Sequence, residues 1–166
     1  MKQKRIVLIT GATSGIGEAT ARLLAETGNY QLILTGRNVE KLSELEADLK
    51  QKTEVKTLMF DVRSAEAVQS SLDSLEGNWK NIDVLVNNAG NAHGLSSFQE
   101  GSLADWDAMI DGNVQGVLYV SRLVIPQMVE RKTGHVINLS SVAGKQTYAN
   151  GAVYCASKKA VEAISE

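Results

Sequence analysis

Apolar runs and amphipathic stretches alternate along nearly the whole chain, and this alternation restricts the fold more than any other feature. Five runs rich in valine, isoleucine and leucine predict strands at residues 5–10, 31–36, 55–61, 82–87 and 135–140. Because the runs are almost continuously apolar, we expect strands that are buried on both faces. Helical patterns lie between and after them, at residues 15–27, 39–51, 64–75, about 103–131, and from near 151 onward. The sequence therefore predicts an α/β fold built from βαβ units.

Right-handed connections between such units place the strands in one parallel sheet with helices on both faces. We expect a doubly wound, Rossmann-like sheet with the strand order 3-2-1-4-5. The long helical pattern should bend or break, because it contains Gly112, Gly116 and Pro126. A dinucleotide-binding sheet of this type has six strands, whereas only five are visible here. We therefore expect one NAD(P)-binding domain over residues 1–166, truncated within its last helix and lacking the C-terminal strands.

Composition excludes several classes of protein. The net charge of −2 gives no field that would attract nucleic acid or an anionic membrane. No apolar stretch is long enough to span a membrane, and the first apolar run is too short for a signal peptide. The single cysteine, Cys155, cannot form an internal disulfide, and neither His93 nor His135 has a cysteine at zinc-site spacing. We expect a cytoplasmic protein without a nucleic-acid, membrane or metal partner.

A glycine-rich turn, T-G-A-T-S-G-I-G, follows the first predicted strand directly. Its G-x-x-x-G-x-G spacing differs from the strict dinucleotide fingerprint, but it lies in the same place between a strand and a helix. Gly11 allows a sharp turn, and Gly15 and Gly17 allow the backbone to approach a pyrophosphate at the helix N-terminus. Thr13 and Ser14 add hydroxyl donors. The alternative is a glycine-rich turn that binds no ligand.

The second predicted strand ends in L-T-G-R, which places Arg37 twenty residues beyond Gly17. An acidic residue at this position would bind the ribose 2′-hydroxyl of NAD, whereas an arginine can pair with a 2′-phosphate in a bidentate manner. Gly36 leaves room for such a group, and the nearest acid, Glu40, belongs to the next predicted helix. The position favours NADP(H) over NAD(H). A surface arginine at a strand end is the alternative.

Six motifs occur in a fixed order along the chain: TGATSGIG, DV at 61–62, NNAG at 87–90, Asn113, NLSS at 138–141 and YCASK at 154–158. Together they resemble the short-chain dehydrogenase/reductase family, with matching order and spacing from residue 7 to residue 160. Within that family, T-G-R after the second strand and the stretch WKNIDVLVNNAGNAHG resemble the NADP-dependent 3-hydroxy acid (serine-type) dehydrogenases.

The resemblance implies an NADP(H) site formed by the glycine turn, the strand ends and the last helix. Asp61 and Val62 would flank the adenine, and the residues of the 87–90 motif would lie beside the adenosine ribose and support the sheet. The full set of implied cofactor residues is Gly11, Thr13, Ser14, Gly15, Ile16, Gly17, Arg37, Asp61, Val62, Asn87, Ala89, Gly90, Tyr154 and Lys158.

The resemblance also implies a catalytic set of Asn113, Ser141, Tyr154 and Lys158. Tyr154 would be the acid/base, and Lys158 would bind the nicotinamide ribose as well. Ser141 would orient the substrate, since it precedes Tyr154 by the 13 residues usual in the family, and Ser140 would then be structural. Asn113 would lie at a helix distortion, where its carbonyl helps to hold a water that relays protons to Lys158.

Physical chemistry explains why a tyrosine and a lysine, Tyr154 and Lys158, would lie one turn apart on the last helix. A phenol with a pKa of about 10 is a poor base at neutral pH. A cation one helical turn away favours the phenolate and so lowers that pKa. Alternatives remain for each residue: Lys158 could simply pack its stem on the ring of Tyr154, and Asn113 could be a residue that bends a helix.

The expected function is therefore hydride transfer between NADP(H) and a small hydroxy or carbonyl compound, such as the 3-hydroxy acid serine, in a homodimer or homotetramer. A dinucleotide-binding protein without catalytic activity, or an inactive fragment, is the competing hypothesis. Several residues are alternative candidates for contact with the substrate. Lys145 and Gln146 are candidates for binding a carboxylate by position alone, and His93 could either touch the substrate or be an ordinary loop histidine. Cys155 is expected only to fill space in its helix.

Overall fold

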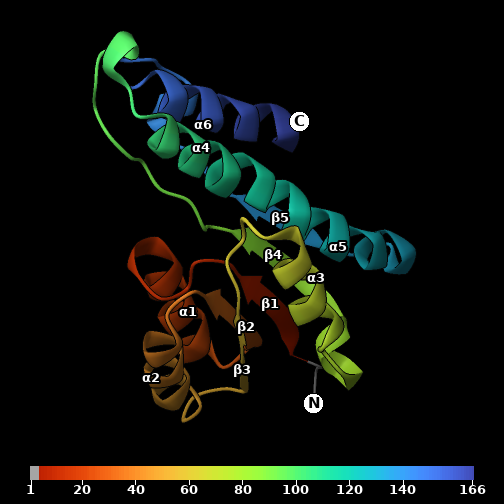
Figure 1. Ribbon diagram of the computed structural model, residues 1–166. Helices are drawn as coiled ribbons and strands as arrows, with labels where there is room; N and C mark the ends of the chain where they lie inside the picture. The colour runs from red at the N-terminus through yellow and green to blue at the C-terminus, as the bar shows by residue number, and fades with distance from the viewer. Residues whose placement is uncertain (1–3) are drawn as a thin grey trace.

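The computed structural model describes residues 4–166, which contain five parallel strands in one sheet (Figure 1). The strands are β1 (Arg5–Ile9), β2 (Tyr30–Gly36), β3 (Val55–Met59), β4 (Ile82–Asn87) and β5 (His135–Asn138). Their order in the sheet is β3-β2-β1-β4-β5, and every neighbouring pair is parallel. The predicted fold class and strand order are confirmed.

Helices follow each strand. They are α1 (Gly15–Thr27), α2 (Val39–Leu49), α3 (Ala65–Asp73), α4 (Leu103–Ile110), α5 (Gly116–Arg131) and α6 (Ala152–Ser165). At the starts of α2, α3 and α4, the side chains of Asn38, Ser64 and Ser102 each accept a hydrogen bond from the backbone N–H three residues on. Ser14 precedes α1 without making such a bond, so the first turn of α1 keeps its N–H groups free of a side-chain cap.

The long helical pattern is interrupted once. A π-helix, Asp111–Gln115, separates α4 from α5, and Gly112 lies within it. The expectation of a break near Gly112 is confirmed. Pro126 does not interrupt α5, which continues to Arg131, so the break in the predicted segment lies at the π-helix and not at the proline. A proline removes only one helical hydrogen bond, and α5 remains helical because its buried side chains pack against the sheet.

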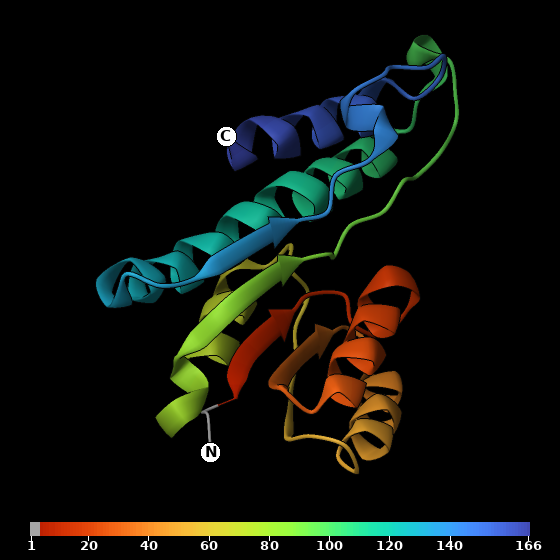
Figure 2. The ribbon, with the colours of Figure 1, turned by 180° about the vertical axis from the view of Figure 1, so that it is seen from behind.

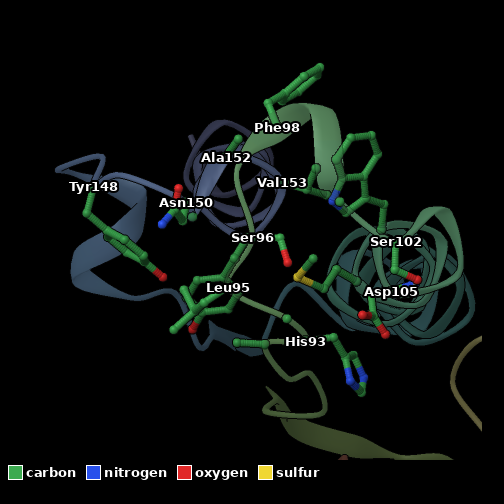
Figure 3. Close-up of a pocket in the computed structure, with 17 residues that line it drawn as sticks. His93, Leu95, Ser96, Phe98, Ser102, Asp105, Tyr148, Asn150, Ala152 and Val153 are labelled. Atoms are coloured by element: carbon green, nitrogen blue, oxygen red, sulfur yellow. The ribbon is translucent and has the colours of Figure 1, made fainter.

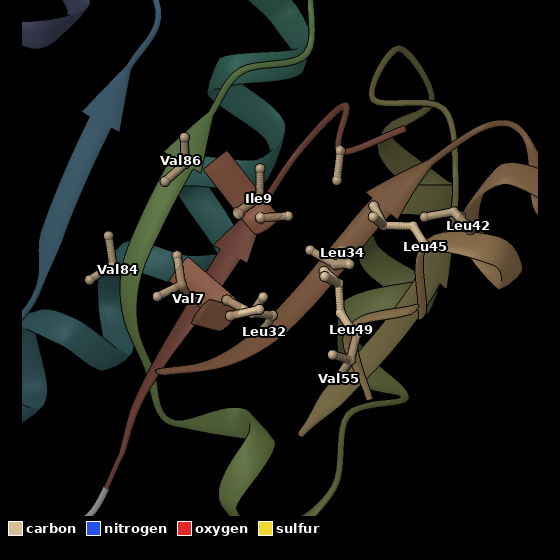
Figure 4. Close-up of a cluster of buried hydrophobic side chains, with 13 residues drawn as sticks. Val7, Ile9, Leu32, Leu34, Leu42, Leu45, Leu49, Val55, Val84 and Val86 are labelled. Carbon is tan, nitrogen blue, oxygen red and sulfur yellow. The ribbon is translucent and has the colours of Figure 1, made fainter. Parts of the chain in front are cut away.

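Alternate residues of the central strands enter two separate cores, as the two faces of a strand require. One face packs against α1 and α2, where Val7 and Ile9 of β1 meet Leu32 and Leu34 of β2 (Figure 4). The opposite face packs against α3 and α5 and contains Ile6, Leu8, Ile33, Leu85, Val120 and Val124. Each fully buried aliphatic side chain contributes about 1.5–3 kcal/mol of transfer free energy. The central strands are therefore buried on both faces, as predicted.

The edge strand β5 differs from the others. Val136 and Asn138 face the layer of α5 and α6, where Val136 packs against the second core and Asn138 bonds to Ser165. His135 and Ile137, on the other face, are exposed. Figure 2 shows this face of β5 with no helix in front of it. Within the described residues, β5 has a helical layer on one side only.

Candidate active site

The carboxyl ends of the strands open into a cleft of about 500 Å³, a size suited to a small-molecule cofactor. Open parallel sheets bind their ligands at this edge. Most of the predicted cofactor residues line the cleft, namely Gly11, Thr13, Ser14, Gly15, Ile16, Arg37, Asp61, Val62, Ala89 and Gly90. Gly17 and Asn87 are buried outside the lining, and Tyr154 and Lys158 lie on α6.

The glycine turn after β1 is held by the loop after β4. Gly11 has a φ of +64°, and a Cβ at this position would lie 2.9 Å from the Cα of Ala89. Nδ2 of Asn88 donates to the carbonyl oxygens of Thr10 and Gly11 at 2.9 and 3.0 Å. Oγ1 of Thr10 accepts hydrogen bonds from the N–H groups of Asn88 and Ala89, both at 3.0 Å. Asn88 was not among the predicted site residues, although the second asparagine of N-N-A-G was an available signal.

Asn87, the first asparagine of that motif, connects four elements. Its Nδ2 donates to Oγ of Ser121 on α5 at 2.9 Å and to Oδ1 of Asn138 on β5 at 2.8 Å. Asn138 donates in turn to Oγ of Ser165 on α6 at 3.0 Å. This chain of hydrogen bonds joins β4 and β5 to both helices, so Asn87 supports the sheet from a buried position.

Charged side chains gather at the rim of the cleft beyond β2 and β3. Arg37 is 63% exposed, and its guanidinium lies 3.5 Å from Oδ2 of Asp61. Arg63 pairs more closely with the same oxygen, at 2.7 Å from Nη2 and 3.0 Å from Nε. Burial by itself would raise the pKa of Asp61, but the hydrogen bonds from Arg63 outweigh it and lower the pKa below the ordinary value of 3.8. Because Arg63 satisfies Asp61, the guanidinium of Arg37 is available to an anion. The room beside Gly36 is occupied by the side chain of Thr13.

Asn113 lies in the π-helix, where three segments meet. Its Oδ1 accepts from the N–H of Asn91 at 2.8 Å, and its Nδ2 donates to the carbonyl oxygen of Asn91 at 2.9 Å. The same Nδ2 donates to Oγ of Ser157 on α6 at 3.0 Å. A Cβ on Gly90 would lie 2.6 Å from Oδ1 of Asn113, so this contact requires a glycine there. The expected helix distortion at Asn113 is present, and its carboxamide joins the loop after β4 to α6.

Lys158 is buried, with 7% of the residue exposed, and its Nζ donates to the carbonyl oxygen of Leu139 at 2.8 Å. Burial lowers the pKa of this ammonium group below its ordinary value of 10.5. Nζ lies 6.0 Å from the centre of the Tyr154 ring, on the same face of α6. No residue in the described part of the chain forms a hydrogen bond with the hydroxyl of Tyr154. The phenol therefore stands free beside a buried cation.

A second cavity, of about 330 Å³, lies between the loop after β4 and the first turns of α4 and α6 (Figure 3). Its polar lining residues include Tyr154, His93, Ser96, Ser102, Asp105, Tyr148 and Asn150. His93 also lines the cofactor cleft, so it lies where the two spaces meet. Lys145 is ion-paired with Glu162, and neither Lys145 nor Gln146 lines the second cavity.

The two adjacent serines have different contacts. Oγ of Ser140 donates to the backbone carbonyl of Lys158 at 3.4 Å, which ties this segment to α6. Oγ of Ser141 accepts from the N–H of Ala143 at 3.2 Å, at the start of the short 3₁₀ turn Val142–Gly144. The hydroxyl proton of Ser141 thus remains able to donate, although Ser141 is not among the residues that line either cavity.

The cleft has features that fit a phosphorylated dinucleotide. The uncapped N-terminus of α1 presents backbone N–H groups next to the lining residues Ser14 and Gly15, and such groups bind phosphate. Oγ1 of Thr35, also in the lining, is the one buried side-chain polar atom of residues 4–166 without a hydrogen-bond partner. Over the same residues, no three acidic, histidine or cysteine side chains cluster as metal ligands would, and no helix is long and apolar enough to cross a membrane.

Comparison with known proteins places these features in a family. The curated NADP-dependent 3-hydroxy acid dehydrogenase of Salmonella typhi is 47% identical over 160 residues, which are 96% of this chain and 63% of that protein. Sulfoacetaldehyde reductase 2 of Chromohalobacter salexigens is also 47% identical, over 95% of this chain and 62% of its own length. The chain thus spans somewhat less than two thirds of these curated relatives.

Solved structures agree with the sequence matches. Serine dehydrogenase from Escherichia coli superimposes with a TM-score of 0.92 at 45% identity, covering 96% of this chain and 73% of that one. A closed form of serine dehydrogenase in complex with NADP⁺ gives the same TM-score and identity over 96% and 63% of the two chains. The sequence profile of the short chain dehydrogenases matches residues 5–166, and the chain belongs to that family.

Proposed function

We propose that the protein is an NADP-dependent oxidoreductase that interconverts a small hydroxy compound and its carbonyl form. The observation that carries the proposal is the buried ammonium of Lys158 beside the free phenol of Tyr154, which lines a cavity adjoining the cofactor cleft. A protein that only senses a dinucleotide has no need for a buried cation at a phenol. The cost of burying Lys158 is therefore better explained by chemistry at that phenol.

We propose the following contacts between the cleft residues and the parts of NADP(H). The N-terminus of α1 and the glycine turn would hold the pyrophosphate, Asp61 and Val62 would flank the adenine, and Arg37 would pair with the 2′-phosphate. Ala89 and Gly90 would lie beside the ribose, and Lys158 would bind the nicotinamide ribose. When bound, the nicotinamide supplies or accepts the hydride. NADP is the cofactor in the name of the similar protein from Salmonella typhi, which agrees with the preference inferred from Arg37.

The remaining task is proton transfer, and Tyr154 would perform it. In oxidation the phenolate would take the hydroxyl proton of the substrate, and in reduction the phenol would donate a proton to the carbonyl oxygen. The positive charge of Lys158 would stabilise the negative charge on the phenol oxygen during proton transfer, and it would act strongly because the ammonium is removed from water. Ser141 would donate a hydrogen bond to the substrate oxygen. Asn113 would fix the loop and α6 relative to each other and help to hold the water of a proton relay to Lys158.

For the substrate we propose a 3-hydroxy acid such as serine, because the relatives named above act on compounds of this type or on a close analogue. We also propose that residues 1–166 form one NAD(P)-binding domain and that the protein assembles as a homodimer or homotetramer in the cytoplasm. Exposed apolar side chains on α5, such as Leu118 and Val129, are compatible with pairing of subunits through that helix.

Replacement of the phenol tests the proposal. Tyr154→Phe should lower kcat by roughly 10²-fold or more, followed as NADPH absorbance, while the affinity for NADPH changes little. Tyr30→Phe, at the start of β2 and far from both cavities, is the matched control and should keep wild-type turnover. Wild-type kcat in Tyr154→Phe would refute the mechanism. A protein that binds NADPH but oxidises no hydroxy acid would favour the non-catalytic alternative.

A further inference from the structure

His93 occupies the point where the cofactor cleft meets the second cavity, since it belongs to the lining of both. Two neighbouring positions fix it there. Asn91 is held on both sides of its backbone by the side chain of Asn113, at 2.8 and 2.9 Å. Gly94 has a φ of +61° and packs against α4, so that a Cβ on it would lie 3.1 Å from Oδ2 of Asp105. The loop therefore presents the imidazole of His93 at a defined place.

The imidazole is half-buried, and no residue in the described part of the chain forms a hydrogen bond with it. Figure 3 shows it on the same side of the cavity as the carboxylate of Asp105. An imidazole always carries at least one N–H, whichever tautomer is present, so His93 has a donor without a partner. A donor held at a cavity wall in this way is suited to bind an acceptor on a ligand.

The rest of the lining limits what that ligand group can be. None of the described residues that line the second cavity is a lysine or an arginine, and Lys145 is held by Glu162. An anionic group on a substrate near Tyr154 would therefore depend on hydrogen-bond donors of the lining, and the N–H of His93 is a donor without a partner among the described residues.

The relatives indicate what the anion would be. In a 3-hydroxy acid, one carbon atom lies between the carbon that is oxidised and the carboxylate group. In sulfoacetaldehyde, one carbon atom likewise lies between the carbonyl carbon and the sulfonate group. In both compounds an oxyanion lies at the same short separation from the reacting carbon. Resting on the function proposed above, we propose that His93 binds the oxyanion of the substrate, with the reacting oxygen at Tyr154 and the oxyanion toward the loop after β4.

Steady-state kinetics test this assignment with two substrates that differ in charge but not in size. His93→Leu should raise KM for 3-hydroxybutanoate roughly tenfold or more, because it removes a hydrogen bond to a charged group, and should leave KM for 3-hydroxybutanamide nearly unchanged. His135→Leu, at the exposed start of β5, is the matched control and should change neither value. An equal rise in KM for the acid and the amide would overturn the assignment. 2-Hydroxyethanesulfonate distinguishes a sulfonate from a carboxylate as the preferred oxyanion.

A second measurement needs no turnover. The chain has two histidines, so their imidazole proton resonances are assigned by comparing the wild type with His93→Leu and His135→Leu. In the NADP⁺-saturated protein, the His93 resonance should shift on addition of 3-hydroxybutanoate and not on addition of the amide. A shift without turnover would support the oxyanion site and refute the proposed reaction. Turnover of the acid without any shift would refute the role of His93 and leave the reaction in place.

Discussion

The centre of the sheet and its β5 edge are held together by different forces. At β1 and β2, aliphatic side chains fill both faces, and the site beside them is a backbone turn set on that core. At β5 one face is exposed, with Ile137 39% accessible, and the neighbouring α6 is joined to the rest by hydrogen bonds that involve Asn138, Asn113 and Lys158. The strands beneath the candidate cofactor cleft are thus held mainly by packing, whereas α6, which carries the candidate catalytic pair, is joined by a polar network.

This difference shows which interactions stabilise the fold and which ones fix the orientation of the side chains. Burial is non-directional and supplies most of the folding free energy, whereas hydrogen bonds contribute little net stability but fix orientation. A turn that binds phosphate through backbone N–H groups needs a firm base. A phenol and an ammonium that act on one substrate need their directions fixed, which the network at Asn113 and Lys158 can do.

The largest contrast should come from paired truncations in the two regions. Leu34→Ala, in the fully buried core beside α1 and α2, should lower the free energy of unfolding by about 3 kcal/mol because it leaves a cavity. Ile137→Ala, on the exposed face of β5, should change it by less than about 0.5 kcal/mol. Urea unfolding followed by circular dichroism measures both free energies. Equal losses of stability in the two variants would contradict the difference between the packed centre of the sheet and its β5 edge.

Removal of the amide at the π-helix tests the polar side of the comparison. Asn113→Ala should cost about 2 kcal/mol of stability, because the backbone N–H and carbonyl of Asn91 lose their partners, and should also lower kcat. Thr35→Val removes a buried hydroxyl that has no partner among residues 4–166, so it should be neutral or stabilising in the absence of cofactor. Thermal unfolding measures the stability of both variants. If Asn113→Ala were as stable as the wild type, the hydrogen bonds of Asn113 would contribute nothing to the stability of the fold.

Cofactor choice should depend on one of the two rim arginines more than on the other. Arg37→Gln should weaken NADPH binding roughly tenfold, because it removes an ion pair with the 2′-phosphate, and leave NADH binding nearly unchanged. Arg63→Gln should have a smaller effect, since Arg63 is engaged with Asp61. Fluorescence titration with both cofactors measures this, and a parallel loss for NADH and NADPH would contradict the phosphate assignment.

The smallest expected effect is a pH dependence at the same rim. The pKa of Asp61 is lowered in the folded protein, so its pair with Arg63 stabilises the fold above the ordinary value of 3.8. That stabilisation is lost as the pH falls through the lowered pKa. The free energy of unfolding of the wild type should therefore exceed that of Arg63→Gln by about 0.5 kcal/mol at pH 7, and the two values should be equal in strong acid. Urea unfolding at several pH values would show it; a constant difference would point to packing of the arginine stem instead.

Sequence patterns predicted the sheet and its strand order, and they pointed to residues that line the cleft at the carboxyl ends of the strands, because periodicity and glycine turns are local signals. They did not predict the contacts that depend on how loops approach one another. The hydrogen bonds of Asn88 to the glycine turn, the filling of the space at Gly36 by Thr13, and the shared position of His93 all join residues distant in the chain. The sequence patterns also did not predict which of Gly112, Gly116 and Pro126 would mark the break, which lies at the π-helix while α5 continues through the proline.

The π-helix at Asp111–Gln115 also changes the rotational phase of the helical segment. One inserted residue turns everything beyond it by about 100° around the axis. Upstream, Asp105 and Met109 face the second cavity, while downstream Val120 and Val124 face the sheet. A single continuous helix could not present both sets to their partners. The extra residue thus lets one segment line the second cavity at one end and pack into the core at the other. Deleting it would turn one of these two sets of side chains away from its partner.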